Sequence, residues 1–123
     1  MINIEFGGKV RGFSWGMKAL EKYCDMMGVD VGGLDLMFNQ GPLQIRATTC
    51  LLLAGMQTYS KHEKEVVDYD YDDVQTWLDE GNPDTLSKIM ADFKESKYLG
   101  RTIQNYFEMA EEAEENPNSK KKE

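Results

Sequence analysis

The first residues of the chain alternate between apolar and polar positions. Residues 2–6 alternate strictly, and residues 10–13 form a second alternating run. A period of two is typical of half-buried strands, and the Gly7-Gly8 pair between the runs suits a tight turn. The pattern predicts a β-hairpin over residues 1–14. Because an isolated hairpin is only marginally stable in water, we expect one of its faces to pack on helices.

The spacing of apolar residues then changes to that of a helix. From Trp15 to Met27 they recur at every fourth position, with charged residues between them. This is the pattern of an amphipathic helix, for which Ser14 is a suitable N-cap and Gly28 a suitable left-handed C-terminal residue. A short helix or turn is predicted over residues 34–38.

Residues 43–59 form the most apolar part of the chain, with few polar positions on any side. A helix that is apolar nearly all round is central to a fold or lies in an interface. Half of residues 60–69 are charged, which predicts a solvated loop.

An acidic segment with a short apolar face follows. Its apolar residues lie between Val74 and Leu78, before a glycine at position 81. The pattern predicts a short helix with Asp70 or Asp72 as its N-cap and Gly81 as its end.

The C-terminal part repeats the helical pattern twice. Asn82 followed by a proline predicts a helix start, and apolar faces follow over residues 86–93 and 103–110. Gly100 either breaks or bends the chain between them, so residues 83–115 form one helix or two.

These elements predict one domain over residues 1–115, because 123 residues suit a single compact domain. The expected fold is mainly α, with a short N-terminal β-hairpin packed on a bundle of about four to six helices. Residues 116–123 are charged and contain a proline, which predicts a disordered tail.

The charge balance narrows the class of partner. The chain has 14 Lys and Arg against 22 Asp and Glu, a net charge of −8, and the excess lies entirely in residues 61–123. Phosphate backbones and anionic lipids repel such a chain, which disfavours nucleic acid and membrane surfaces. The longest apolar run is too short to cross a bilayer, and the start lacks a signal-peptide pattern. We therefore expect a soluble, unexported protein whose partner is another protein.

The residues offer no catalytic or metal-binding set. Cys24 and Cys50 lie apart in apolar stretches and predict reduced, buried thiols, and His62 has no oriented acid or nucleophile beside it. The aspartates from Asp68 onward superficially resemble a calcium loop, yet the required glycine is missing at the sixth position, so helix capping is the simpler interpretation. We expect no enzyme, metal or cofactor.

Several short motifs resemble one protein family. They are Ile-x-Ile-x-Phe-Gly-Gly-Lys at the start, Phe13-x-x-Gly-Met-x-Ala-Leu, Tyr23-Cys24, Met27-Gly28-Val29-Asp30, Ile45-Arg46-Ala47 and Tyr71-Asp72-Asp73-Val74-x-x-Trp77-Leu78-Asp79. Together they resemble the tail assembly chaperones of long-tailed, siphovirus-like bacteriophages or prophages. The resemblance spans residues 2–98 loosely and is strongest over residues 4–30 and 70–79.

The resemblance implies a non-enzymatic, mainly helical protein that binds the tape measure protein. It would keep this client soluble for assembly of the tail tube, with the tail tube protein as a further partner. It would act in the cytoplasm of the host cell and be absent from the mature virion. The apolar helix over residues 43–59 also fits a homo-oligomer.

The resemblance also implies a longer product made by ribosomal frameshifting. Consecutive lysine codons at Lys120–Lys122 would fit the A-rich slippery run that such a shift needs, whereas a flexible basic tail explains the same residues. A slippery heptamer and an overlapping downstream frame in the gene would decide between the two.

The expected client-binding residues are apolar residues in a glycine-flanked segment and aromatic residues near the C-terminus. They are Leu34, Leu36, Met37, Phe38, Tyr98, Tyr106 and Phe107. Two other classes of function stay open. One is a small structural virion protein, such as a tail or connector subunit, and the other is an acidic inhibitor or DNA mimic.

Overall fold

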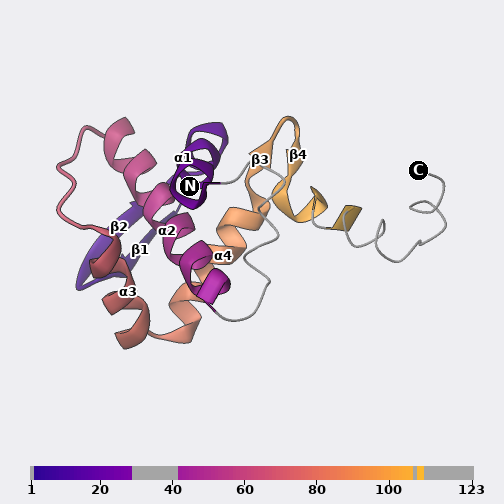
Figure 1. Ribbon diagram of the computed structural model, residues 1–123. Coiled ribbons are helices and arrows are strands. Elements are labelled where there is room, and N and C mark those ends of the chain that lie inside the picture. Colours follow the sequence, from indigo (N-terminus) through magenta and orange to yellow (C-terminus); the bar gives the residue numbers. More distant parts are fainter. Residues whose placement is uncertain (1, 29–41, 107, 110–123) are drawn as a thin grey trace.

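The computed structural model describes residues 2–28, 42–106, 108 and 109 (Figure 1). In chain order the elements are β1 (Ile2–Phe6), β2 (Lys9–Phe13), α1 (Met17–Met27), α2 (Pro42–His62), α3 (Tyr71–Glu80), α4 (Pro83–Glu95), β3 (Lys97–Tyr98) and β4 (Arg101–Thr102). The chain is helical again from Ile103. The protein is mainly helical with an N-terminal β-hairpin, which confirms the predicted fold class. The turn or helix predicted over residues 34–38 and the tail predicted over residues 116–123 lie outside the described residues.

The β1–β2 hairpin is antiparallel and closes through Gly7-Gly8, as predicted. Both glycines have positive φ, 69° and 87°, which a two-residue turn of type I′ requires. Ile4 lies opposite Arg11 in the register, and residues opposite each other point to the same face of a sheet. Lys9 lies opposite Phe6 in the same way, so two positions on the apolar face of Ile4 and Phe6 are occupied by cations.

Helix α2 is the centre of the fold. Every residue from 49 to 56 is buried, so the helix is covered on all sides. One core cluster joins α2 to α1 and to the C-terminal end of α4, and a second joins it to the β1–β2 hairpin, α3 and the middle of α4. Figure 1 shows α2 between these groups of elements. Of the two predicted places for this helix, the centre of the fold or an interface, the structure shows the first.

The start of α1 differs from its prediction. The helix begins at Met17 after Gly16, whose φ of 102° is outside the helical range, and Ser14 is not its cap. The backbone N–H of Ser14 instead donates to the carbonyl oxygen of Gly55 at 3.0 Å. This bond holds the residues before the helix against α2. At the other end, Gly28 adopts the predicted left-handed conformation with φ 70°.

The solvated loop predicted over residues 60–69 is partly wrong. Helix α2 continues to His62, and Tyr69 is 8% exposed. The hydroxyl groups of Tyr69 and Ser60 form a buried hydrogen bond of 3.0 Å. Because this bond satisfies both hydroxyls, the polar segment can bring an aromatic ring into the core.

The predicted caps of the next two helices are confirmed. Asp70 accepts a hydrogen bond from the N–H of Asp73 at 2.9 Å, and the Asp73 side chain accepts one from the N–H of Asp70, so the two form a capping box. Helix α3 ends at Gly81, and Asn82 caps α4 ahead of its proline.

The open question about residues 83–115 has an answer up to residue 109. Helix α4 ends at Glu95, and the short β3–β4 hairpin follows before the chain becomes helical again. Leu99 and Gly100 form the turn of this hairpin, with φ values of 53° and 84°. No helix in the described part of the chain is long and apolar enough to cross a membrane.

Candidate functional site

A groove of about 690 Å³ lies between the turn of the β1–β2 hairpin, the C-terminal end of α3 and the first turns of α4. We call it the α3–α4 groove. Its apolar lining is Phe6, Trp77, Leu78 and Leu86, and its acidic lining is Glu5 and Glu80. Phe6 is buried and the other three apolar side chains are half-buried, whereas both carboxylates are exposed. The groove therefore offers apolar surface next to exposed negative charge.

Trp77 is held in the groove by the hairpin. The Arg11 guanidinium lies 4.2 Å from the centre of the Trp77 ring, and Phe6 meets the ring edge-on at 5.6 Å. A Cβ atom added to Gly7 would lie 2.4 Å from the ring, so only glycine allows this approach. Because three hairpin residues contact it, the indole is fixed before any partner arrives.

Arg11 has a structural role beneath the groove. Its side chain is only 9% exposed, and it donates hydrogen bonds to the Phe6 carbonyl oxygen at 2.7 Å and to Asp68 at 3.1 Å. Asp68 also accepts from Lys9 at 2.8 Å. The hydrogen bonds from Lys9 and then Arg11 lower the pKa of Asp68 to about 2. The two cations of β2 are therefore engaged with Asp68.

Sequence reasoning missed this role of Arg11, although the signal was present. A two-residue turn at Gly7-Gly8 places residue 11 on the face of Phe6. A charged residue on the apolar face of a strand indicates a buried, paired charge.

The negative charge of the chain is concentrated around α3. Residues 65–87 contain eight acidic residues and no Lys or Arg: Glu65, Asp68, Asp70, Asp72, Asp73, Asp79, Glu80 and Asp84. The remaining 14 acidic residues equal the 14 basic ones, so this segment accounts for the whole net charge of −8. A sequence count over this window would have found it. The structure places most of the window on α3 and at the start of α4, instead of in a loop.

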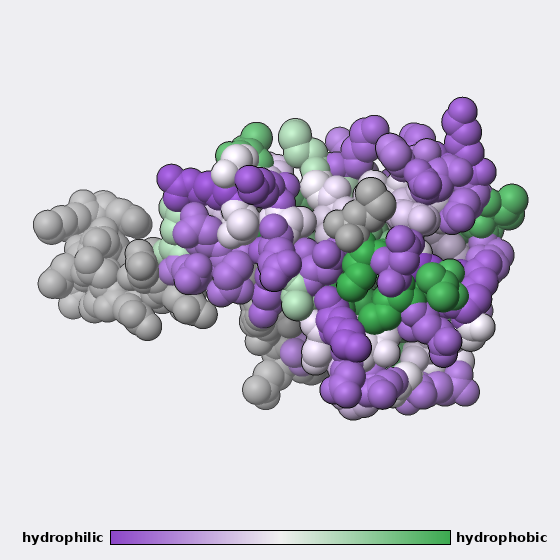
Figure 2. All heavy atoms as spheres, turned by 180° about the vertical axis from the view of Figure 1, so that it is seen from behind, coloured by the Kyte–Doolittle hydropathy of each residue, from purple (hydrophilic) through white to green (hydrophobic). Residues whose placement is uncertain are grey.

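The hydrophobic surface is uneven as well. Seen from behind, hydrophobic side chains gather on the half of the molecule that holds the β1–β2 hairpin, surrounded by hydrophilic ones (Figure 2). This is also the half in which the α3–α4 groove lies.

Two of the predicted client-binding residues lie together. Tyr98 and Tyr106 are both half-buried, their rings meet edge-on at 5.9 Å, and the Tyr106 hydroxyl donates to the Tyr98 carbonyl oxygen at 2.8 Å. Tyr98 also lines a second groove of about 360 Å³, the α1–β3 groove, with Met17 and Leu20. The other predicted residues, Leu34, Leu36, Met37, Phe38 and Phe107, lie outside the described part of the chain.

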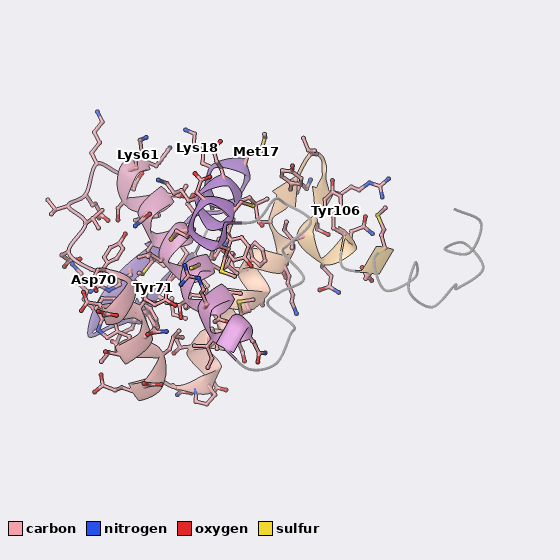
Figure 3. The ribbon with its side chains drawn as sticks, viewed as in Figure 1. Met17, Lys18, Lys61, Asp70, Tyr71 and Tyr106 are labelled. Carbon is pink, nitrogen blue, oxygen red and sulfur yellow. The ribbon has the colours of Figure 1, made fainter. Side chains whose placement is uncertain are left out.

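The two tyrosines and the acidic helix lie at different ends of the molecule. Figure 3 shows Tyr106 beside the β3–β4 hairpin, whereas Asp70 and Tyr71 start α3 on the opposite side. Sequence reasoning predicted the tyrosine end and missed the α3–α4 groove.

Reactive side chains are few among residues 2–28 and 42–109, leaving out residue 107. No three His, Cys, Asp or Glu side chains in this part of the chain lie close enough to hold a metal ion. His62 is exposed and pairs with Glu63 at 2.9 Å. Cys50 is buried, and burial raises the pKa of its thiol.

Comparison with models of protein families, with curated proteins and with solved structures gave no match for this chain.

Proposed function

We propose that this protein is a tail assembly chaperone of a long-tailed bacteriophage or prophage. It binds the tape measure protein and keeps it soluble until the tail tube assembles around it. It acts in the host cytoplasm and does not remain in the virion. The proposal starts from the resemblance of the sequence motifs to that family.

One structural observation supports the proposal most directly. The two segments with the strongest resemblance, residues 4–30 and 70–79, are far apart in the sequence but meet at the α3–α4 groove. Gly7 and Gly8 from the first segment line it together with Trp77 and Leu78 from the second. If the groove binds the client, both motifs contribute to the same binding site.

The chemistry of the groove is consistent with a binding role. An aromatic ring fixed in a half-buried position is typical of residues that anchor protein interfaces. Trp77 meets this description, with half-buried Leu78 and Leu86 beside it. Such surface can cover an apolar stripe of a client helix while the client waits for its final partner.

Co-expression with the tape measure protein encoded nearby tests the proposal. We expect the two proteins to co-elute in size-exclusion chromatography with light scattering, and the client to be soluble only in the presence of this protein. Leu86→Ser should reduce the co-eluting fraction, because Leu86 lines the groove. Leu99→Ser is the matched control, because Leu99 is 69% exposed on the β3–β4 turn.

Elution of this protein alone, with an aggregated client, would overturn the proposal. Purified phage particles should then be examined for the protein. Its presence there would favour the alternative of a small structural virion protein.

A further inference from the structure

We infer that the α3–α4 groove binds an amphipathic helix in which Lys or Arg residues flank the apolar stripe. This rests on the proposed function and specifies which part of the client the groove selects. The juxtaposition that carries it is an apolar surface with exposed carboxylates and no basic side chain among the described residues that line it.

The apolar part of the groove suits the side chains of a helix. Leu78 and Trp77 come from the end of α3, Leu86 from the first turns of α4, and Phe6 from the end of β1. A helix presents its apolar residues at positions i, i+3, i+4 and i+7, which is how amphipathic helices occupy hydrophobic grooves.

The charge of the groove selects the polar face of that helix. Glu5 and Glu80 are exposed at its edge. The two cations of β2 are already engaged, because Lys9 and Arg11 both bond to Asp68. A partner with basic residues beside its apolar stripe gains favourable contacts there, and a partner with acidic residues is repelled.

The charge distribution of the whole chain agrees with this preference. Residues 65–87 contain all of the excess negative charge, and α3 brings its C-terminal end to the groove. An electrostatic field of one sign near an apolar surface attracts partners of opposite charge and also limits association between copies of this chain.

Two model peptides provide the first test. Each has about 18 residues, or five helical turns, with leucines at the same helical spacing. One peptide carries lysines at all other positions, and the other carries glutamates. We expect the lysine peptide to bind and the glutamate peptide not to bind, with the affinity of the lysine peptide falling as salt increases.

NMR spectra can locate the bound peptide. The chain has two tryptophans, and only Trp77 lines the groove, whereas the Trp15 indole N–H donates to Asp92 at 2.8 Å elsewhere. The lysine peptide should shift the indole signal of Trp77 and leave that of Trp15 in place. It should also shift the amide signals of Gly8 and Gly81, which line the groove, but not that of Gly28.

Charge reversal separates a local effect from one of net charge. The double variant Glu5→Lys, Glu80→Lys changes the net charge by +4, from −8 to −4. The control variant Glu95→Lys, Glu108→Lys makes the same change in net charge on exposed residues outside the groove. We expect the first to weaken binding of the lysine peptide about tenfold and the control about twofold or less. Circular dichroism would show that each variant is folded.

Several results would overturn the inference. The inference is wrong if the two peptides bind equally well, or if neither binds. It is also wrong if the lysine peptide leaves the NMR signal of Trp77 unshifted, or if the two double variants weaken binding of this peptide equally. The proposed function is judged separately, by co-elution of the tape measure protein. If that client co-elutes equally well with both double variants, the inference is wrong and the proposed function stands. If the lysine peptide binds the groove but the tape measure protein does not co-elute, the proposed function fails and the preference of the groove stands.

Discussion

Gly55 provides a test of the packing because its substitution should have the opposite of the usual effect. In the interior of a helix, alanine is normally about 1 kcal/mol more favourable than glycine. Here a Cβ atom at Gly55 would lie 2.4 Å from Cζ3 and 2.6 Å from Cη2 of Trp15. Both distances are far below the 3.5–4.0 Å of normal carbon contacts. Either the indole or helix α2 must therefore move.

The indole of Trp15 is held on several sides. Its Nε1 donates to Asp92 at 2.8 Å, its ring stacks on Phe13 at 5.9 Å, and it meets Phe93 edge-on at 5.2 Å. Overpacking of this kind costs about 1–3 kcal/mol. Subtracting about 1 kcal/mol for the better helix former leaves a net destabilisation of up to about 2 kcal/mol for Gly55→Ala.

Urea unfolding followed by circular dichroism measures this change. For a chain of this size, the midpoint of thermal unfolding should also fall, by up to roughly 10 °C. In a Trp15→Phe background the larger ring is gone, so Gly55→Ala should become neutral or stabilising, and a double-mutant cycle gives the difference. The packing argument is refuted if Gly55→Ala stabilises the original chain, or if its cost is the same in both backgrounds.

Three further predictions concern other parts of the fold. In urea unfolding, Gly7→Ala should destabilise the protein by about 1–3 kcal/mol more than Gly8→Ala. Both glycines have positive φ, but only Gly7 lies against an indole ring. Equal costs of the two substitutions would contradict that contact. Asp68→Asn should lower the stability at neutral pH. Its difference from the original chain should shrink as the pH falls from about 4 and be lost below about 2, because the lowered pKa of Asp68 contributes its full stability only above this range. A constant difference down to pH 2 would contradict this. In the folded protein a thiol reagent should modify half-buried Cys24 and spare buried Cys50 until unfolding, and mass spectrometry would show the order.

The parts of the fold that were predictable depend on local sequence. The Gly7-Gly8 turn, the Asp70 cap and the Asn82 cap each involve residues within a few positions of one another. The central position of α2 is one of the two places that its lack of a polar face predicted. Each of these features is specified by neighbours in the chain, so a single sequence is sufficient to find it.

The unpredicted parts depend on contacts between distant residues or on very short elements. Gly7 and Trp77 are separated by most of the chain, and no local pattern shows that they meet. Tyr69 is in a charged segment, and it is buried in a core cluster with the distant residues Phe6, Phe13 and Ile89. Strands β3 and β4 have only two residues each, which is too few to show an alternating pattern.

The placement of charge along α3 gives a last prediction that separates stability from binding. Acidic residues stabilise the N-terminal end of a helix and destabilise its C-terminal end, by about 0.3–1 kcal/mol each. Asp72 lies in the first turn of α3, whereas Glu80 is its last residue, and the last turn contains no basic residue. Glu80 therefore opposes the helix dipole in the place where it lines the α3–α4 groove.

A residue that lowers stability at a binding surface is explained if it serves binding. We expect Glu80→Gln to raise the free energy of unfolding by about 0.3–1 kcal/mol and to weaken binding of the lysine peptide. Asp72→Asn, the matched change at the other end of the same helix, should lower stability by a similar amount and leave the binding nearly unchanged, because Asp72 does not line the groove. If Glu80→Gln lowers the free energy of unfolding, or if both variants weaken binding of the lysine peptide equally, then the Glu80 carboxylate does not serve binding in the α3–α4 groove.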